Sequence, residues 1–172
     1  LSSFQISDTK RGFSFKSEGP LNMEMGINRC SVFDVVNKLT KDDLVKIIKI
    51  LGEEKDAKRV ANEIIKYREK KTIEKSSELT SIIKKAKRNH NNFKKDPSTK
   101  TFQALRIFVN KEITELMNGV VNATKILKPG GKILIISFHS IEDKIIKFYF
   151  KNFSKNRSRS NKYFPENNDR LT

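Results

Sequence analysis

The sequence contains a single cysteine, no tryptophan and only four prolines in 172 residues. One cysteine, Cys30, excludes an internal disulfide and a cysteine-based metal site, and such a chain suits a reducing compartment. The two histidines, His90 and His139, are isolated from each other and from any cysteine cluster. Because no spacing of metal ligands is present, we expect no metal site.

Long apolar runs are also missing. No stretch approaches the roughly 20 apolar residues that a membrane-spanning helix needs. The opening Leu1-Ser2-Ser3-Phe4 is unlike a signal peptide. We therefore expect a soluble, cytoplasmic protein with no membrane partner, and, because the first residue is Leu rather than Met, an N-terminus that lies upstream.

Acidic residues are scarce relative to basic ones. The 20 Asp and Glu face 36 Lys and Arg, which gives a formal net charge of +16. Such a charge attracts polyanions, so nucleic acid is the first partner to consider. The alternative is that solvent-facing positions have drifted to lysine without a functional purpose, and charge alone does not decide between the two.

The first half of the chain carries apolar residues at helical spacing. Ser31 is placed to cap a short helix, Thr40 and Asp43 form a capping box for the next, and Gly52 ends it. The helices are expected at about residues 31–39, 40–51, 53–69 and 76–88. Together they predict a small helical subdomain.

The second half predicts a mixture of helix and strand. A helical stripe covers residues 102–127, with a possible break at Gly119, and a turn follows at 127–132. The uninterrupted apolar run 133–136 is typical of a strand that is buried on both faces. A helix, a turn and such a strand form one step of a parallel sheet, so the pattern predicts an α/β fold.

Four stretches of the chain carry a resemblance to one family. They are Ser2-Ser3-Phe4-Gln5 with Arg11-Gly12-Phe13-Ser14-Phe15 and Gly19-Pro20-Leu21; Gly52-Glu53-Glu54 with Ala57 and Arg59; Thr99 to Ile107; and Pro129-Gly130-Gly131 through Ser137-Phe138-His139-Ser140 with Glu142-Asp143. In this order and spacing, over residues 1 to 150, the chain resembles the bacterial 16S rRNA cytosine-N4 methyltransferases. These enzymes methylate a cytidine in the decoding region of the small ribosomal subunit.

The resemblance implies a fold, a cofactor and a partner. The expected fold is a partial class I, Rossmann-like methyltransferase sheet with an inserted all-helical subdomain. The cofactor would be S-adenosyl-L-methionine, and the partner 16S rRNA or the small ribosomal subunit. The implied divisions are a core loop region at 1–30, a helical substrate-recognition subdomain at 31–95, the methyltransferase core at 96–153 and a basic flexible tail at 154–172.

For the cofactor, the resemblance implies one contact, Gln5. The sequence has no glycine-rich turn between a strand and a helix, and Gly130-Gly131 precedes the predicted strand as an ordinary turn. We therefore expect the chain to bind the cofactor poorly and to be inactive alone, as a partial copy without the family's N-terminal cofactor motif and C-terminal end.

Five residues are candidates for direct contacts with RNA. Arg11, Lys100 and Arg106 offer cations for phosphates, although for Arg106 a structural ion pair is an equal alternative. Phe13 and Phe15 are placed to stack on an extruded base or, alternatively, to anchor their loop to the core.

His139 follows the predicted strand at the end of a sheet where open α/β folds place their active sites, so it is a candidate for orienting the substrate amine. The alternative is a helix-capping histidine, and Ser140, Glu142 and Asp143 share that ambiguity. No catalytic residue is assigned. The chain also departs from the family, with Asn22-Met23-Glu24-Met25 in place of Asp-Met-Arg-Met.

Two other classes of function stay open beside the methyltransferase. One is a non-catalytic RNA-binding protein acting on ribosomal RNA, and the other is a helical adaptor between proteins whose charge is incidental. Steep salt dependence of RNA binding would favour the first over the second.

Overall fold

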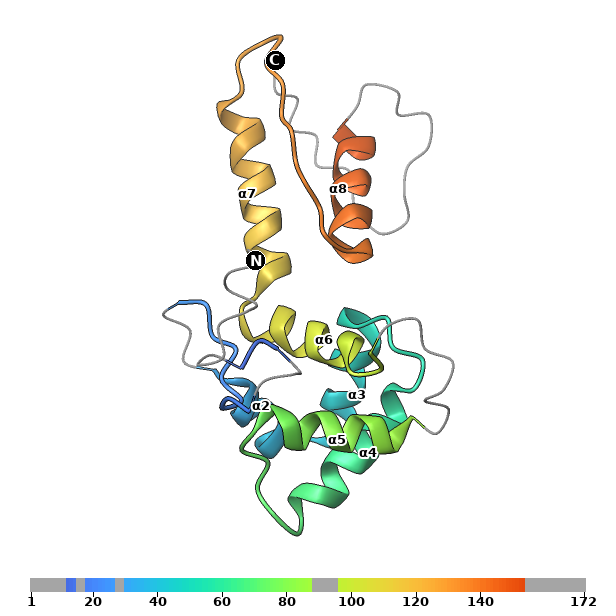
Figure 1. Cartoon of the computed structure of the whole chain (residues 1–172). Helices are drawn as coiled ribbons and strands as arrows, with labels where there is room; N and C mark the ends of the chain where they lie inside the picture. The colour runs from blue at the N-terminus through green and yellow to red at the C-terminus, as the bar shows by residue number, and fades with distance from the viewer. Residues whose placement is uncertain (1–11, 15–17, 27–29, 88–95, 154–172) are drawn as a thin grey trace. The chain divides into compact units, whose positions relative to one another are not determined.

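The computed structural model describes residues 12–14, 18–26, 30–87 and 96–153 (Figure 1). The helices of this part are α2 (Val32–Lys38), α3 (Lys41–Leu51), α4 (Ala57–Arg68), α5 (Ser76–Ala86), α6 (Thr99–Val109), α7 (Glu112–Ile126) and α8 (Ser140–Phe153). None of them combines the length and the apolar character that a bilayer-crossing helix requires. The chain divides into two compact units, residues 1–117 and 118–172, and the division falls within α7.

The first unit is a helical cluster around one apolar core. Helix α3 packs against α4 and α6, and α4 packs against α5. The largest fully buried side chains of this core are aliphatic: Leu21, Met23, Leu44, Ile48, Ile64, Ile73, Leu79, Ile83 and Leu105. Burying aliphatic side chains of this size stabilises a fold by about 1.5–3 kcal/mol each, so this core holds the unit together.

Local capping sets the starts of the first two helices, as the sequence predicted. The Ser31 hydroxyl accepts the Asp34 amide at 3.1 Å, and the Thr40 hydroxyl accepts the Asp43 amide at 3.2 Å. Gly52 ends α3, and a β-carbon there would lie 2.6 Å from the Lys100 carbonyl oxygen. This glycine is therefore also required by the close approach of α6 to α3.

The predicted long helix over 102–127 is wrong in one respect, because the break comes at Asn110 and Lys111 and not at Gly119. Lys111 has a φ of 51°, in the left-handed region that ends a helix. The Asn110 side chain binds backbone of residues 23–25, far away in the sequence. A tertiary contact thus decides the break.

The predicted α/β fold with a partial Rossmann-like sheet is also wrong for the described residues, which contain helices and no strand. The only β-type pairing recorded among them is an isolated antiparallel bridge between Pro20 and Lys75. Residues 131–137 form neither helix nor strand, and Figure 1 shows them as an extended segment after α7. A strand exists only through its hydrogen bonds to a partner, so β-favouring residues alone do not make one.

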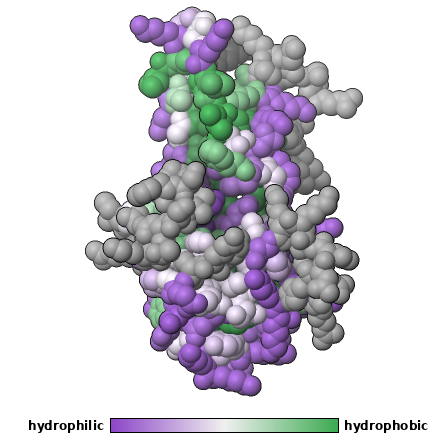
Figure 2. Space-filling model, viewed as in Figure 1, coloured by the Kyte–Doolittle hydropathy of each residue, from purple (hydrophilic) through white to green (hydrophobic). Residues whose placement is uncertain are grey.

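The run 133–136 was expected to be buried on both faces, and one of its faces is open. Leu134 is 92% exposed and Ile136 74% exposed, whereas Ile133 and Ile135 are half-buried. In the second unit the Thr124 hydroxyl lies 2.7 Å from the Tyr149 hydroxyl, which links α7 to α8. On the face drawn in Figure 2, a hydrophobic area flanked by hydrophilic residues covers part of this unit. Its exposed apolar residues include Ile126, Leu127, Leu134, Ile136, Phe138, Phe148 and Phe153.

We expect this surface to drive association of the isolated chain, because an extended segment without a partner and with exposed apolar side chains is prone to pair with other chains. The double substitution Leu134→Lys and Ile136→Lys should therefore lower the weight-average mass in sedimentation experiments. The matched control is Ile50→Lys on α3, since Ile50 is 65% exposed but lies outside this segment. Equal association of all three proteins would contradict the expectation.

Candidate functional site

Three parts of the first unit hold the loop of residues 19–25: the segment around Glu74, the start of α2 and, as described below, Asn110. On one side, the Leu21 amide donates to the Glu74 carbonyl at 3.1 Å, and the Ser76 amide donates to the Gly19 carbonyl at 3.1 Å. On the other, the Phe33 amide donates to the Leu21 carbonyl at 2.7 Å. Backbone at the start of α2 and backbone at and just before the start of α5 therefore hydrogen-bond to the loop.

Asn110 holds the same loop from the end of α6. Its side-chain nitrogen donates to the Met23 carbonyl at 2.8 Å and to the Arg106 carbonyl at 2.9 Å. Its side-chain oxygen accepts the Met25 amide at 2.7 Å. Met23 has a φ of 53°, so this amide stabilises a backbone conformation that a non-glycine residue rarely adopts. The loop is thus rigidly positioned, with Asn22 beside the clamped residue.

Gly12 lies directly against the backbone of the loop, at Pro20. Its φ is 67°, and a β-carbon would lie 1.9 Å from the Pro20 carbonyl oxygen. The Ser76 hydroxyl also donates to the Gly12 carbonyl at 3.3 Å. Only glycine fits here, which explains physically why Gly12 stands in one of the stretches that resemble the methyltransferase family.

The RNA-binding candidates lie at different places in the structure. Phe13 is 7% exposed and belongs to the core cluster, so its ring has no free face for a stacked base. Lys100 is exposed and donates from Nζ to the Glu53 carbonyl at 3.0 Å. Gln5, Arg11 and Phe15 lie outside the described residues.

Arg106 uses its guanidinium fork inside the first unit. Nε donates to one carboxylate oxygen of Glu112 at 2.8 Å, and Nη2 donates to the other at 3.1 Å. The side chain of Arg106 is 19% exposed and that of Glu112 is 14% exposed. The structural ion pair is therefore present, and it links α6 to the start of α7 across the break at Lys111.

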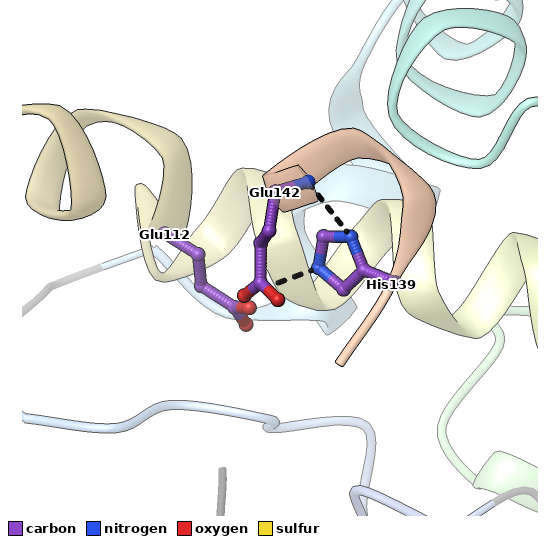
Figure 3. A group of neighbouring side chains, drawn as sticks. All are labelled: Glu112, His139 and Glu142. Atoms are coloured by element: carbon purple, nitrogen blue, oxygen red, sulfur yellow. Dashed lines mark hydrogen bonds and ion pairs between the residues drawn. The ribbon is translucent and has the colours of Figure 1, made fainter. Parts of the chain in front are cut away.

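His139 stands immediately before α8 and caps it. Its Nδ1 accepts the Glu142 amide at 3.4 Å, and its Nε2 lies 3.4 Å from a Glu142 carboxylate oxygen, as Figure 3 shows. The other carboxylate oxygen of Glu142 accepts the Phe138 amide at 2.8 Å. Both ring nitrogens thus face Glu142, and the arrangement is that of a helix N-cap. Glu112, also drawn in Figure 3, belongs to the first unit.

Sequence reasoning missed a buried ion pair in the first unit. Lys87 donates from Nζ to the Glu54 carboxylate and to the Pro97 carbonyl, and the side chains of Lys87 and Glu54 are only 4% and 6% exposed. The pair ties the end of α5 to the turn after α3 and to the segment before α6. In the sequence, this ion pair was indicated only by Glu54, which stands in one of the stretches that resemble the methyltransferase family.

Glu78 in the first turn of α5 fixes the backbone beside the loop. One carboxylate oxygen binds Lys71 Nζ at 2.6 Å, and the other accepts the amides of Glu74 and Lys75 at 2.9 and 3.1 Å. The hydrogen bond from Lys71, followed by that from the Glu74 amide, lowers the pKa of Glu78 to about 2. The charged carboxylate is therefore part of the local structure around Glu74.

This shift predicts a pH dependence. Because the pKa of Glu78 is lowered on folding, its contribution to stability is present above its ordinary value of 4.5 and is lost as the pH falls toward about 2. The substitution Glu78→Gln should therefore lower the unfolding free energy at neutral pH and flatten its dependence between these two values. Carboxyl chemical shifts followed by NMR should give the midpoint directly, and a midpoint near 4.5 would contradict the assignment.

The one pair of adjacent glycines does not form a cradle for a nucleoside cofactor. The Gly130-Gly131 pair follows α7 as a turn into the extended segment 131–137, with Gly130 at a φ of 78°, and no helix N-terminus follows it directly. A glycine-rich turn that binds such a cofactor leads from a strand into a helix. The Gly130-Gly131 turn therefore lacks the form that holds a nucleoside cofactor, and Gln5, the one cofactor contact that the resemblance implies, lies outside the described residues.

Comparison with known proteins shows which family the chain belongs to. The sequence model described as the MraW methylase family matches residues 1–170. The chain belongs to the MraW methylase family. Among curated relatives, a protein of Buchnera aphidicola subsp. Schizaphis graminum named ribosomal RNA small subunit methyltransferase H is 48% identical over 157 residues.

Further curated relatives carry the same name. The protein of Ehrlichia canis is 45% identical over 154 residues, 88% of this chain and 51% of the relative. That of Rhizobium etli is 41% identical over 170 residues, 99% of this chain and 50% of the relative. For the Buchnera protein the shares are 90% and 49%. The chain thus spans about half the length of the curated relatives it matches, and the predicted family resemblance is confirmed.

Proposed function

We propose that this chain is the RNA-recognising part of an S-adenosyl-L-methionine-dependent enzyme that methylates N4 of a cytidine in the decoding region of 16S rRNA. The observation that carries the proposal is the match to the MraW methylase family over residues 1–170. The relatives named above are ribosomal RNA small subunit methyltransferases. We also propose that the protein acts in the cytoplasm, on the small ribosomal subunit or its RNA.

The charge and the residues present favour RNA binding over cofactor binding as the role of the described residues. A net charge of +16 favours a polyanionic partner. The cofactor, when bound to a complete enzyme, would supply an electrophilic methyl group on its sulfonium. Since the Gly130-Gly131 turn lacks the form that holds such a cofactor, we assign the described residues to holding the RNA and derive no step of methyl transfer from them.

The second candidate function is a non-catalytic RNA-binding protein that acts on ribosomal RNA. Residues 12–14, 18–26, 30–87 and 96–153 contain no glycine-rich turn from a strand into a helix, which favours this function for the chain taken alone. Both candidates require RNA binding, and they differ in whether the chain recognises the site that the complete enzymes modify.

A competition experiment tests the proposal. Excess chain should lower the initial rate at which the complete Ehrlichia canis relative transfers labelled methyl groups to small ribosomal subunits, and additional subunits should relieve the inhibition. The control is an unrelated basic protein of equal net charge, which should inhibit less at the same concentration. Inhibition no stronger than that of the control would favour the non-catalytic RNA-binding function.

Binding to RNA is predicted to be strongly salt-dependent, because each phosphate contact releases bound counterions. The logarithm of the association constant for single-stranded RNA should fall linearly with the logarithm of the salt concentration. In parallel, calorimetric titration with S-adenosylmethionine should give no binding heat. Salt-independent association would contradict RNA recognition, and tight cofactor binding would contradict the assignment of the described residues to RNA.

A further inference from the structure

One side of helix α4 carries a row of cations. Lys58, Asn62 and Lys66 follow one another at intervals of four residues, which places them on the same side of the helix at steps of about 6 Å. Arg59 adjoins Lys58. The opposite side of the helix is apolar and buried in the core of the first unit. Its residues are Ala57, Val60, Ala61 and Ile64. Helix α4 therefore has a core side and a basic side.

Helix α5 adds a further cation to the basic side. Helices α4 and α5 pack against each other. The Glu63 carboxylate of α4 binds Lys66 Nζ at 3.4 Å and Nζ of Lys85, a residue of α5, at 3.5 Å. The two lysines are thus neighbours through one carboxylate. We define the α4 face as the cations Lys58, Arg59, Lys66 and Lys85.

The acids beside the α4 face lie deeper than its cations. The side chains of Arg59, Lys66 and Lys85 are 68%, 72% and 80% exposed. Those of their partners Asp56 and Glu63 are only 36% and 23% exposed. A solvent-exposed ion pair contributes little to stability, so a phosphate can replace these carboxylates at little expense. The charge that an approaching ligand meets first is therefore positive.

The stability of α4 does not account for Lys58 and Arg59. Both stand in the first turn, which contains no acidic residue, although the positive end of the helix dipole disfavours cations there. The N-cap residue Asp56 forms no capping hydrogen bond with its side chain and binds Arg59 instead. Lys58 is exposed and forms no ion pair within the part of the chain that the structure describes. Cations that weaken their own helix indicate a role in binding an anion.

We propose that the α4 face binds neighbouring phosphates of the RNA and does not read its bases. Rows of lysine and arginine neutralise a phosphate backbone. Recognition of unpaired bases uses aromatic platforms, and Tyr67, the one aromatic residue of α4, packs against the core. A membrane-surface helix needs its apolar side free for the lipid, whereas that of α4 is buried. The inference rests on the proposed function, because it names the surface through which the first unit would hold the RNA.

The test compares two triple variants of the full chain. In the first, the cations of α4 are replaced by glutamine: Lys58→Gln, Arg59→Gln and Lys66→Gln. In the control, the same number of exposed lysines is replaced in the second unit: Lys125→Gln, Lys128→Gln and Lys147→Gln. Fluorescence anisotropy gives the association constants for a short oligouridylate and for an RNA of equal length and mixed base sequence, each at several salt concentrations.

The α4 variant should lose a large part of the salt dependence. Its slope of the logarithm of the association constant against that of the salt concentration should be shallower by about 2, since each lost phosphate contact with a single strand removes about 0.7. At about 50 mM salt both RNAs should bind at least about tenfold more weakly, and to the same extent, because every sequence presents the same phosphates. The control should keep nearly the original slope, and unchanged circular dichroism spectra and urea midpoints verify that both variants are folded.

The outcomes separate this inference from the function on which it rests. Equal loss of slope in the two variants would show that binding depends on net charge alone and would overturn the role of the α4 face. Weaker binding of only one of the two RNAs would overturn it as well, since it would indicate contacts with bases. Displacement of the RNA by polyglutamate at an equal concentration of charges would assign the face to an acidic protein. No RNA binding by the unaltered chain would overturn the proposed function itself.

Discussion

Replacement of Lys87 by methionine is expected to lower the free energy of unfolding by about 3–5 kcal/mol, since it removes one partner of a buried ion pair. The remaining Glu54 carboxylate would be left at 6% exposure without its cation, and the Pro97 carbonyl would lose its donor. Urea denaturation followed by circular dichroism measures the change. An effect below about 1 kcal/mol would show that solvent reaches the site.

Two further variants identify the cause. The double variant Lys87→Met with Glu54→Leu should recover most of the loss, because replacing both charges by apolar groups is often neutral or stabilising. The surface control Lys46→Met breaks the ion pair of Lys46 with Asp43, in which the lysine side chain is 71% exposed, and should change stability by about 1 kcal/mol or less. Equal effects of Lys87→Met and Lys46→Met would contradict a buried pair.

Replacement of Asn110 by alanine should lower the free energy of unfolding by about 2–4 kcal/mol, because it leaves the Met23 carbonyl and the Met25 amide without their partner. Asn110 is 5% exposed, so water does not readily replace the lost bonds. The loop of residues 19–25 should also become more sensitive to limited proteolysis. Both effects are measured on the same preparation.

Its control is Asn62→Ala on the half-buried surface of α4, which should leave stability within about 0.5 kcal/mol, since the Asn62 side chain does not bind a distant segment within the described residues. A conservative variant of Asn110 is informative as well. Asn110→Asp keeps an acceptor for the Met25 amide but places an oxygen against the Met23 carbonyl, so it should not rescue the fold. A stable Asn110→Asp variant with a protease-resistant loop would contradict the clamp.

Several features of the first unit were predictable because they depend on neighbours in the sequence. The caps of Ser31 and Thr40 each join residues three positions apart, so a capping pattern in the sequence is enough to reveal them. The end of α3 at Gly52 follows the same logic. The family, too, was recognisable from short stretches that each preserve local chemistry.

The candidate site was less predictable. Arg106 offered a choice between phosphate and an ion pair, and its partner Glu112 lies six positions away, a spacing that brings side chains together only because the helix breaks at Lys111. Phe13 stands in a glycine-containing loop, and only the packing shows that its ring enters the core. The local sequence pattern indicated both alternatives for each residue, but only the tertiary structure shows that Arg106 forms an ion pair and that Phe13 is buried in the core.

The sequence by itself determined the helices between residues 31 and 88, the caps at Ser31 and Thr40, the basic charge and the family, since each of these is a property of composition or of neighbouring residues. Tertiary structure alone decided the break at Asn110, the burial of Lys87 against Glu54 and the hold of Asn110 on the loop of residues 19–25. It also decided that the run 133–136 is extended without being a strand in the described part of the chain. The physical reason is the same in each case, because these features are bonds between segments that lie far apart in the sequence, and no local preference specifies a distant partner.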